Sequence, residues 1–242
     1  MMTEAEPSTD GPLVWFVEIP ALLTPEQEAA LLPELGPEDK TPERLPASLH
    51  PRVRAERILG RFYLRNLLEA ETGYPGLSWK IDVDAQGKPQ VAHPALSDAP
   101  HINLSHTHGA LLCGLGYQGP LGVDIEDCER AVDFEKLEQR CFTKHEREWL
   151  ASAESRHDGF FRAWTLKEAY LKAIGTGIRT PLQSIEIVPD AQGCILCTQD
   201  GDLVSQWRLE TKRHAHFSLA LCENATKSSA QVPRWEFKQY LK

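Results

Sequence analysis

The stretch Asp84-Ala85-Gln86-Gly87 recurs 106 residues later as Asp190-Ala191-Gln192-Gly193. The neighbouring segments repeat as well, because a strand-like triplet precedes each copy and a His-x-His triplet with an apolar run follows it. These segments are residues 81–83 and 106–113 around the first copy, and residues 185–187 and 214–222 around the second. Three matching features in the same order indicate an internal duplication.

The duplication predicts an α+β fold made of two pseudo-twofold-related halves. Each half has a helix followed by a strand-turn-strand pattern, so we expect a helix packed on a small antiparallel sheet. The boundary falls near the glycine-rich stretch Gly116–Gly122, which gives an N-terminal half of residues 1–118 and a C-terminal half of residues 119–242. We expect the active site at the interface of the halves, where a concave surface can hold a ligand.

The segment Gly122–Glu126, with the sequence GVDIE, has the alternation of a β-strand. Asp124 and Glu126 are two residues apart, so their side chains point to the same face. Two like charges on one strand face repel each other, unless they are solvated or share a cation. The segment is therefore either a solvated edge strand or part of a cation site.

A helix is predicted from Phe160 to Ile174, and Gly175-Thr176-Gly177 supplies its stop. Glu168 falls in the middle of the apolar stripe of this helix. Burial of an unpaired carboxylate costs several kcal/mol or forces protonation. Lys172 follows one turn later and can pair with Glu168. The alternatives are a functional carboxylate and lysine, or a surface ion pair beside an aromatic cluster.

Four arginines in the first half follow helical spacing on one stripe: Arg54, Arg57, Arg61 and Arg65. Each one alone is adequately explained as part of a solvated helix face. As a stripe in an acidic protein, they indicate a site for an anionic ligand.

Composition excludes several classes of function. The chain has 242 residues and a formal net charge of -9, so nonspecific nucleic-acid binding is not expected. No run of about 18 apolar residues is present, so we expect no membrane span. The acidic start, Met1–Gly11, does not resemble a signal peptide. The six cysteines lie mostly in apolar patterns, which indicates reduced core thiols of a cytoplasmic protein.

Five ordered motifs resemble the signature of the 4'-phosphopantetheinyl transferases. They are GKP at 87–89, NLSH at 103–106, GVDIE at 122–126, FTKHE at 142–146 and WTLKEAYLK at 164–172. The length and the duplication are similar to the surfactin-synthetase-activating (Sfp) type, and among its members the chain most resembles the broad-specificity pseudomonad enzymes. The resemblance spans residues 87–177 and is weak before Arg44 and after Gly177.

The resemblance implies that the 4'-phosphopantetheine arm of coenzyme A is transferred to a serine of an apo carrier protein, with release of 3',5'-ADP. The implied Mg²⁺ ligands are Asp124, Glu126 and Glu168, and Lys172 would reach the phosphate under attack. The residues implied around the 3'-phosphate and adenine end of coenzyme A are Lys88, Pro89, Ser105 and His106, with Arg44, Arg57 and Arg61 as further candidates. The implied partners are apo acyl, peptidyl or aryl carrier proteins, and one chain with two halves is expected to act as a monomer.

The general base is open at this point. Glu168 is the first candidate, directly or through a metal-bound water, and Glu146 is the second. Glu146 also completes a capping box with Thr143, which is a sufficient structural explanation. The helix after Phe142 and the segment Ser152–Asp158 are candidate docking edges for the carrier. Two other functions fit the same residues: a different Mg²⁺-dependent phosphotransferase or hydrolase, and a non-catalytic binding module.

Overall fold

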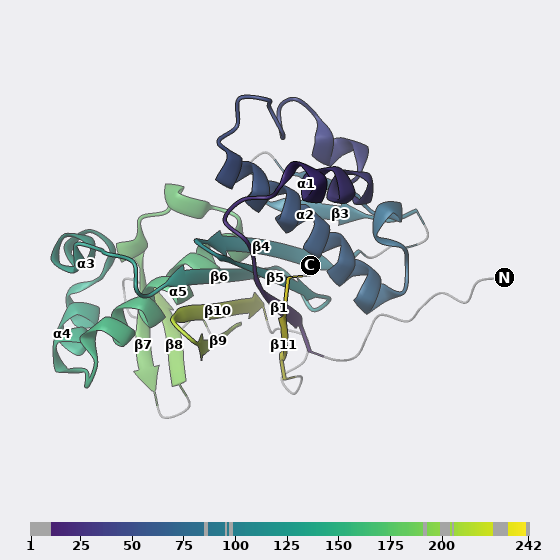
Figure 1. Ribbon diagram of the computed structural model, residues 1–242. Coiled ribbons are helices and arrows are strands. Elements are labelled where there is room, and N and C mark those ends of the chain that lie inside the picture. The colour runs from purple at the N-terminus through teal and green to yellow at the C-terminus, as the bar shows by residue number, and fades with distance from the viewer. Residues whose placement is uncertain are drawn as a thin grey trace. The chain divides into compact units, whose positions relative to one another are not determined.

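The computed structural model describes residues 11–84, 87–94, 96, 99–190, 193–198, 204, 206–224 and 232–240 (Figure 1). The middle residues of both repeated turns, 85–86 and 191–192, lie outside the described residues. The chain is α+β and divides into two compact units. Unit 1 comprises Met1–Tyr117 with Ala230–Lys242, and unit 2 comprises Gln118–Ser229.

Unit 1 is a mixed sheet with a long helix. Its strands run in the order β11-β1-β5-β4, and every pairing is antiparallel except β1 with β11. Its elements are β1 (Leu13–Glu18), α1 (Pro25–Leu31), η1 (Leu32–Glu34), η2 (Pro37–Lys40), α2 (Pro51–Thr72), η3 (Gly76–Ser78), β2 (Lys80–Val83), β3 (Pro89–Ala92), β4 (His101–Thr107), β5 (Ala110–Gly116) and β11 (Arg234–Lys238).

Helix α2 has a clear start signal and a clear stop signal in its sequence. The His50 side chain accepts a hydrogen bond from the backbone of Arg52, and Pro51 is the first helical residue, a position that needs no amide donor. Gly73 ends the helix with a left-handed φ of 73°. The apolar face of the helix packs on the sheet through fully buried side chains such as Leu64 and Leu67. This burial provides the core of unit 1.

Unit 2 has a helix packed on an antiparallel sheet with the strand order β6-β10-β9. Helix α5 ends at Gly175, which has a φ of 77°. The elements of unit 2 are β6 (Leu121–Asp127), α3 (Phe134–Cys141), α4 (Lys144–Ser152), α5 (Arg156–Ile174), η4 (Gly177–Arg179), η5 (Leu182–Ser184), β7 (Ile185–Asp190), β8 (Gly193–Thr198), β9 (Trp207–His214) and β10 (Phe217–Asn224).

Gly122 lets helix α5 approach strand β6 closely. A Cβ atom at this position would lie 2.0 Å from the carbonyl oxygen of Ala169 and 2.5 Å from the amide nitrogen of Ala173. Only glycine fits such a contact, because real Cβ atoms do not approach backbone atoms this closely. The contact fixes the helix that carries Glu168 and Lys172 against the strand that carries Asp124 and Glu126.

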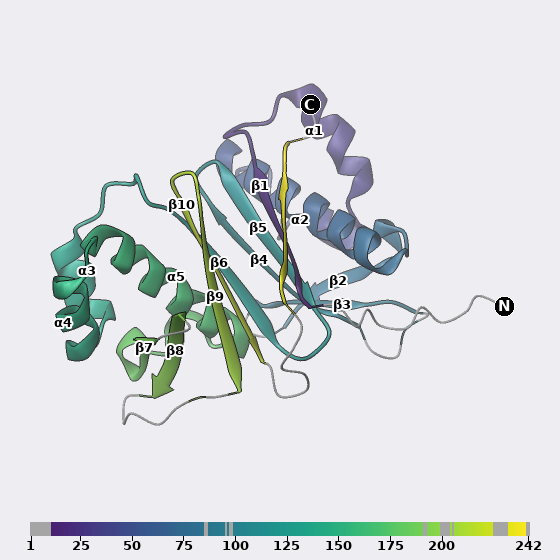
Figure 2. The same ribbon diagram turned by 90° about the horizontal axis from the view of Figure 1, so that it is seen from below.

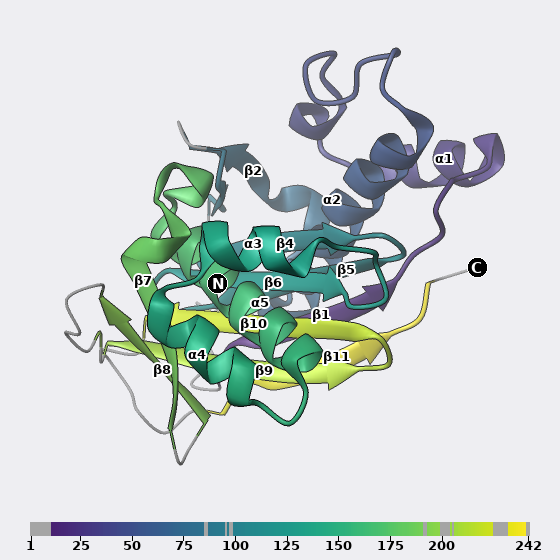
Figure 3. The same cartoon turned by 90° about the vertical axis from the view of Figure 1, so that its left-hand side faces the viewer.

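The two units share a core order of elements, and Figures 2 and 3 show these elements from two further directions. In each unit a first strand precedes the long helix, and two hairpins follow it. The second hairpin is β4–β5 in unit 1 and β9–β10 in unit 2, and its last strand pairs antiparallel with the first strand of the unit. This topology confirms the predicted helix on an antiparallel sheet in each half. The pseudo-twofold relation of the halves stays a prediction.

The C-terminal tail is a correction to the predicted halves. The sequence assigned it to the C-terminal half, 119–242, but strand β11 pairs in parallel with β1 of unit 1. The rings of Phe16 and Phe237 lie 5.8 Å apart, and Arg234 forms a 2.6 Å ion pair with Glu71. Pairing between strands so far apart in the chain leaves no local pattern in the sequence.

The cysteines whose side chains are described are reduced and buried, as the sequence predicts. Cys113, Cys128, Cys141 and Cys222 are free and buried, and the side chains of Cys194 and Cys197 lie outside the described part of the chain. No helix in the described residues is long and apolar enough to cross a membrane.

Candidate functional site

Unit 1 contains a basic pocket of about 310 Å³. It gathers residues from the segment before α2, from α2 itself and from strand β4. Its basic lining residues are Arg44, Arg57, Arg61 and His106, all four of which the sequence analysis singled out. Three guanidinium groups around one small pocket provide many hydrogen-bond donors with a fixed geometry, which suits a phosphate group.

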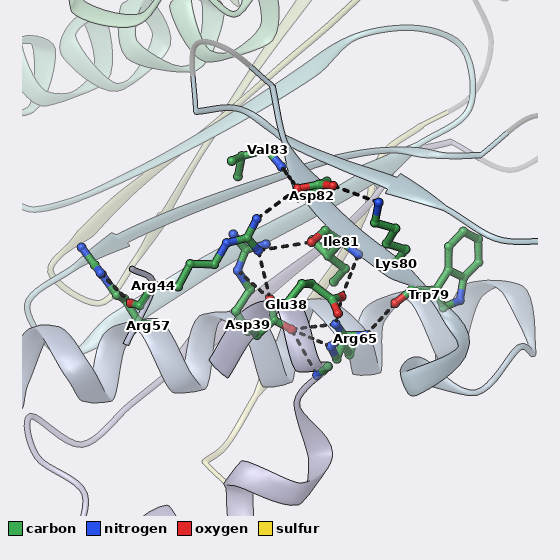
Figure 4. Close-up of polar contacts among 12 residues, drawn as sticks. Glu38, Asp39, Arg44, Arg57, Arg65, Trp79, Lys80, Ile81, Asp82 and Val83 are labelled. Carbon is green, nitrogen blue, oxygen red and sulfur yellow. Dashed lines mark hydrogen bonds and ion pairs between the residues drawn. The ribbon is translucent and has the colours of Figure 1, made fainter. Parts of the chain in front are cut away.

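Asp39 also lines this pocket and contacts three arginines, two of which, Arg44 and Arg65, are labelled with it in Figure 4. Its carboxylate is fully buried. Arg65 donates to Oδ2 of Asp39 from Nε at 3.0 Å and from Nη2 at 2.6 Å. Oδ1 of Asp39 forms ion pairs with Arg44 at 3.5 Å and Arg61 at 3.4 Å. The sequence analysis missed Asp39, because its arginine partners lie on other elements and no local spacing relates them.

The predicted arginine stripe divides into two groups. Arg65 is buried and donates to the carbonyl oxygens of Gly76 and Trp79 as well as to Asp39. Arg54 forms a 2.6 Å ion pair with Glu28 of α1. These two arginines tie elements of unit 1 together. Arg57 and Arg61 line the pocket.

Arg44 is held against strand β2. Its guanidinium donates to the carbonyl oxygen of Ile81 at 3.2 Å and to Asp82 at 3.3 Å, and Arg57 donates to the backbone carbonyl of Arg44 at 2.6 Å (Figure 4). These contacts anchor a residue that precedes α2 in an irregular segment. They explain how Arg44 reaches the same pocket as the arginines of the helix.

Strand β4 brings His106 to the pocket, but not its neighbour Ser105. Successive side chains of a strand point to opposite faces, so Ser105 is buried while the side chain of His106 is 51% exposed. Nδ1 of His106 lies 3.6 Å from the Glu56 carboxylate of α2. Lys88 and Pro89 lie at the start of β3 and are not among the pocket residues that the structure describes. Their predicted contact with coenzyme A, and that of Ser105, stays a prediction.

Unit 2 brings together the acidic residues and the lysine of the two signature motifs. Asp124 and Glu126 lie on β6, where they pair in register with Ala220 and Ser218 of β10. Lys172 of α5 forms a 2.6 Å ion pair with Asp124. Helical spacing predicted a partner for Lys172 within its own helix, and it could not show this contact with a strand.

Glu126 is held by two residues to which the sequence assigned no functional role, Trp164 of the WTLKEAYLK motif and Arg130. The indole nitrogen of Trp164 donates to it at 2.9 Å, and Arg130 forms an ion pair with it at 3.2 Å. Burial and the charge of Asp124 raise the pKa of Glu126 to about 7, although Arg130 and the Trp164 hydrogen bond oppose the shift. Trp164 is one turn before Glu168 on α5, and this spacing was the available signal for its role.

Glu168 of α5 is half-buried, and the charges of Asp124 and Lys172 act on it. Burial, followed by the charge of Asp124, raises its pKa, and the charge of Lys172 lowers it. Among the described residues, no three His, Cys, Asp or Glu side chains are drawn together as a ready-made metal site. Asp124 nevertheless raises the pKa of both glutamates, so a divalent cation would relieve a repulsion that already exists. Three carboxylates are suitable ligands for Mg²⁺, and their role as metal ligands stays a prediction.

Glu146 has the structural role that its capping box predicts, and its place as a candidate base stays a prediction. Its side chain is fully buried, and it accepts hydrogen bonds from Nζ of Lys167 at 2.5 Å and from the backbone of Thr143 and Ile187, each at 2.8 Å. The capping box with Thr143 is present. Oε2 therefore has two donors and Oε1 has one, all within unit 2, and these contacts hold the carboxylate in the fold.

The start of helix α4 forms a second pocket, of about 270 Å³, in unit 2. The predicted docking edge after Phe142 lies in this region. Its basic lining residues are Lys144, His145 and Arg147, and Glu186 lines it as well. The other predicted edge, Ser152–Asp158, spans the end of α4 and the start of α5.

Residues 120–222 match the family model of the 4'-phosphopantetheinyl transferase superfamily. The chain is 37% identical over 139 residues to the 4'-phosphopantetheinyl transferase HetI of Nostoc sp. (strain PCC 7120). This matched region covers 57% of this chain and 58% of the relative. The chain is 32% identical over 132 residues to the 4'-phosphopantetheinyl transferase gsp of Aneurinibacillus migulanus, which covers 54% of this chain and 52% of the relative. The matched region thus spans little more than half the length of these two relatives.

One solved structure with a matching region is a holo-(acyl-carrier-protein) synthase from Bacillus anthracis in complex with coenzyme A (3',5'-ADP). It is 26% identical, with a TM-score of 0.37, and the match covers 43% of this chain and 92% of that chain.

Proposed function

We propose that this chain is a 4'-phosphopantetheinyl transferase, which transfers the 4'-phosphopantetheine group of coenzyme A to a serine of an apo carrier protein. The observation that carries the proposal is the group formed by Asp124 and Glu126 of β6 with Glu168 and Lys172 of α5. These residues lie within the segment that matches the family model, residues 120–222. Their charges act on one another across the contact of strand and helix.

The reaction breaks one bond and forms one bond. The serine oxygen of the carrier attacks the phosphate that bears pantetheine, the bond to the bridging oxygen of the pyrophosphate breaks, and 3',5'-ADP leaves with the electron pair. The serine proton passes to a base, and Glu168 is our assignment for it because Glu146 is enclosed by Lys167 and backbone amides. The ammonium group of Lys172 would stabilise charge on the phosphate under attack.

Mg²⁺ is the proposed cofactor. Asp124, Glu126 and Glu168 would hold it, and it would neutralise charge that develops on the leaving group. Asp124 and Glu126 would offer the cation a fixed pair of carboxylates, because they share one face of a strand that pairs along its whole length with β10. Trp164 orients Glu126 through its hydrogen bond.

Coenzyme A is the proposed second substrate, with its 3'-phosphate in the basic pocket of unit 1. Arg44, Arg57, Arg61 and His106 surround that pocket. Lys88, Pro89 and Ser105 remain candidates for the adenine end. On this assignment, residues 1–118 hold the nucleotide end and unit 2 performs the chemistry.

Apo acyl, peptidyl and aryl carrier proteins are the proposed partners. These carriers and coenzyme A are acidic, and this chain is acidic too, so docking must depend on local basic patches. The pocket at the start of α4, with Lys144 and Arg147, is such a patch. Further parts of the proposal are a monomeric enzyme in the cytoplasm, and a special likeness to the broad-specificity pseudomonad enzymes.

Intact-mass analysis of carriers tests the function. Apo carriers of the acyl, peptidyl and aryl classes are incubated separately with the protein, coenzyme A and Mg²⁺, and a parallel set contains a chelator in place of the metal. We expect a mass gain of one phosphopantetheine in at least one carrier, with no gain in the chelator set. Absence of a gain in every carrier would rule the function out.

Thermal stabilisation distinguishes the neighbouring function of another Mg²⁺-dependent phosphotransferase or hydrolase. A ligand that binds only the native state raises the melting temperature, by an amount that grows with the logarithm of the ratio of its concentration to its Kd. We expect stabilisation by coenzyme A and 3',5'-ADP in the presence of Mg²⁺, and none by ATP at the same concentration. Stabilisation by ATP alone would favour the alternative.

A further inference from the structure

We propose that Asp39 is a positioning residue, which holds Arg44 and Arg61 in the orientation that recognises a terminal phosphate on a nucleotide ligand. The inference rests on the proposed function, which places the 3'-phosphate of coenzyme A in this pocket. Asp39 lines the base of the pocket and does not itself bind the phosphate, because like charges repel. Its contribution is to fix the arginines before the ligand arrives.

The two oxygens of the Asp39 carboxylate have different tasks. Oδ2 accepts from the backbone amide of Gly36 at 3.3 Å and from two nitrogens of Arg65 at 3.0 and 2.6 Å. These contacts anchor the carboxylate inside unit 1. Oδ1 lies 3.5 Å from Nη1 of Arg44 and 3.4 Å from Nε of Arg61. One oxygen is therefore fixed to the fold by hydrogen bonds, and the other attracts the two arginines of the pocket through ion pairs without a hydrogen bond.

Charge balance leaves the pocket cationic. Arg65 is buried outside the pocket lining and offsets the charge of Asp39 through two hydrogen bonds to one oxygen. Among the other lining residues, the three arginines outnumber the two carboxylates, Glu43 and Glu56. Arg44 and Arg61 then retain their charge toward the ligand. Burial and the charges of Arg44 and Arg65 lower the pKa of Arg61, whereas Asp39 raises it. Without Asp39, three guanidinium groups would repel one another, and the orientation of Arg61 would be lost.

Arg61 has a donor that the fold does not use. Its Nε faces Asp39, while its Nη1 is buried and has no hydrogen-bond partner among the described residues. A buried donor without an acceptor is costly, so native structures rarely retain one without a reason. Arg61 lines the pocket, and a small turn of its guanidinium would bring this donor to a phosphate oxygen.

Glu43 provides the matched control. It lines the same pocket and is exposed, and the structure shows no ion pair between it and an arginine in the described part of the chain. Glu43→Gln changes the charge of the pocket by the same amount as Asp39→Asn. Only Asp39→Asn removes the carboxylate that holds Arg44 and Arg61.

The experiment compares coenzyme A with 3'-dephospho-coenzyme A as substrates, which differ only by the terminal phosphate. KM and kcat are measured with one apo carrier for the wild type, Asp39→Asn and Glu43→Gln. The wild type should prefer coenzyme A by about ten- to a hundredfold in kcat/KM, the effect of one or two charge-assisted hydrogen bonds. Asp39→Asn should lose most of this preference through a higher KM for coenzyme A alone, with kcat at saturation retained. Glu43→Gln should keep the preference.

Each outcome gives a distinct answer. If Asp39→Asn keeps the full preference, or if it lowers kcat/KM equally for both substrates, Asp39 has no positioning role while the proposed function stands. If the wild type uses neither substrate, the proposed function itself fails. Should Asp39→Asn not fold, Asp39→Glu replaces it, since it keeps the charge but displaces the carboxylate by one methylene. An unchanged preference in Asp39→Glu would then overturn the proposal.

Discussion

Glu146 and Glu168 are both acidic residues of signature motifs, but their surroundings give them different tasks. Glu146 is enclosed by Lys167 and two backbone amides within the core of unit 2. Glu168 is half-buried, next to Asp124 and Lys172. Residue type and spacing alone could not separate them. The surroundings of each carboxylate lead to opposite predictions for the same substitution.

Glu168→Gln should abolish transfer and leave the fold intact. The substitution keeps the size of the side chain and removes a charge from a group that already repels Asp124, so the free energy of unfolding should stay the same or rise slightly. We expect a loss of at least about a hundredfold in kcat, as for removal of a general base. Carrier mass analysis and thermal unfolding check the two halves of this prediction, and retained activity would remove Glu168 from its role.

Glu146→Gln should destabilise unit 2 without a specific effect on catalysis. Loss of one partner from a buried ion pair leaves Lys167 without its counter-charge in the core, which costs about 3 kcal/mol. Denaturant unfolding measures this change. Activity per folded molecule, measured well below the melting temperature, should stay within about threefold of the wild type.

Glu148→Gln is the control for that experiment. Glu148 lies on the same helix, and its ion pair with Lys144 is exposed, with side-chain exposures of 60% and 82%. Its free energy of unfolding should change by less than about 0.5 kcal/mol. Equal destabilisation by the two substitutions would contradict the structural role of Glu146.

Single residues also show the limits of prediction from the sequence. Helical spacing correctly selected Lys172 as important and gave it Glu168 as a partner, but it could not show that Asp124 lies 2.6 Å away on a strand. Asp39 was missed for the same reason, since Arg44, Arg61 and Arg65 are its partners through the fold. Periodicity reports contacts within one element, and site geometry depends on contacts between elements.

At the scale of elements, the contact of β6 with α5 determines the geometry of the acidic group. Both the strand and the helix carry proposed functional residues, and Gly122 sets the distance between the strand and the helix. The sequence predicted the end of α5 at Gly175, where a left-handed φ of 77° ends the helix. The predicted start at Phe160 was late by one turn, because Ser155 caps a polar first turn that has no apolar period.

Gly122→Ala should separate strand and helix. The added Cβ would meet backbone atoms of α5 at 2.0 and 2.5 Å, and a backbone cannot turn aside as a flexible side chain can. We expect a loss of about 3 kcal/mol in the free energy of unfolding and a marked fall in kcat, because Lys172 moves relative to Asp124.

Gly119→Ala is the matched control for Gly122→Ala. There the nearest atom, Cβ of Asn224, would lie 3.3 Å away, so small shifts suffice. Both free energies come from denaturant unfolding. Similar values for the two variants would show that the close approach of α5 to β6 has no special role.

At the scale of the whole molecule, the duplication was readable from the sequence and the place of the tail was not. The repeated turn and its flanking segments correspond to equivalent hairpins in the two units. Strand β11 has no counterpart in the repeat, and it joins unit 1 by a parallel pairing with β1. A short strand of five residues that pairs with the other end of the chain carries no periodic signal that would name its partner.

Removal of residues 230–242 should weaken unit 1 selectively. The truncation takes β11 away from β1 and removes the Phe16–Phe237 and Glu71–Arg234 contacts. Hydrogen exchange should then show faster exchange in β1, with little change in β6 and β10, and the exposed edge should increase aggregation. The substitution Val232→Ser, at a residue that is 75% exposed, should leave β1 protected. Unchanged exchange in β1 of the truncated chain would contradict the role of β11.

The position of β11 also has a consequence for biosynthesis. Unit 1 contributes the first strand of the chain and needs a strand that lies beyond the whole of unit 2 in the sequence. Because a ribosome delivers the chain from its N-terminus and domains fold as units, unit 2 can complete its sheet while the edge of β1 is still unpaired. The half that is translated first is therefore the half that is finished last.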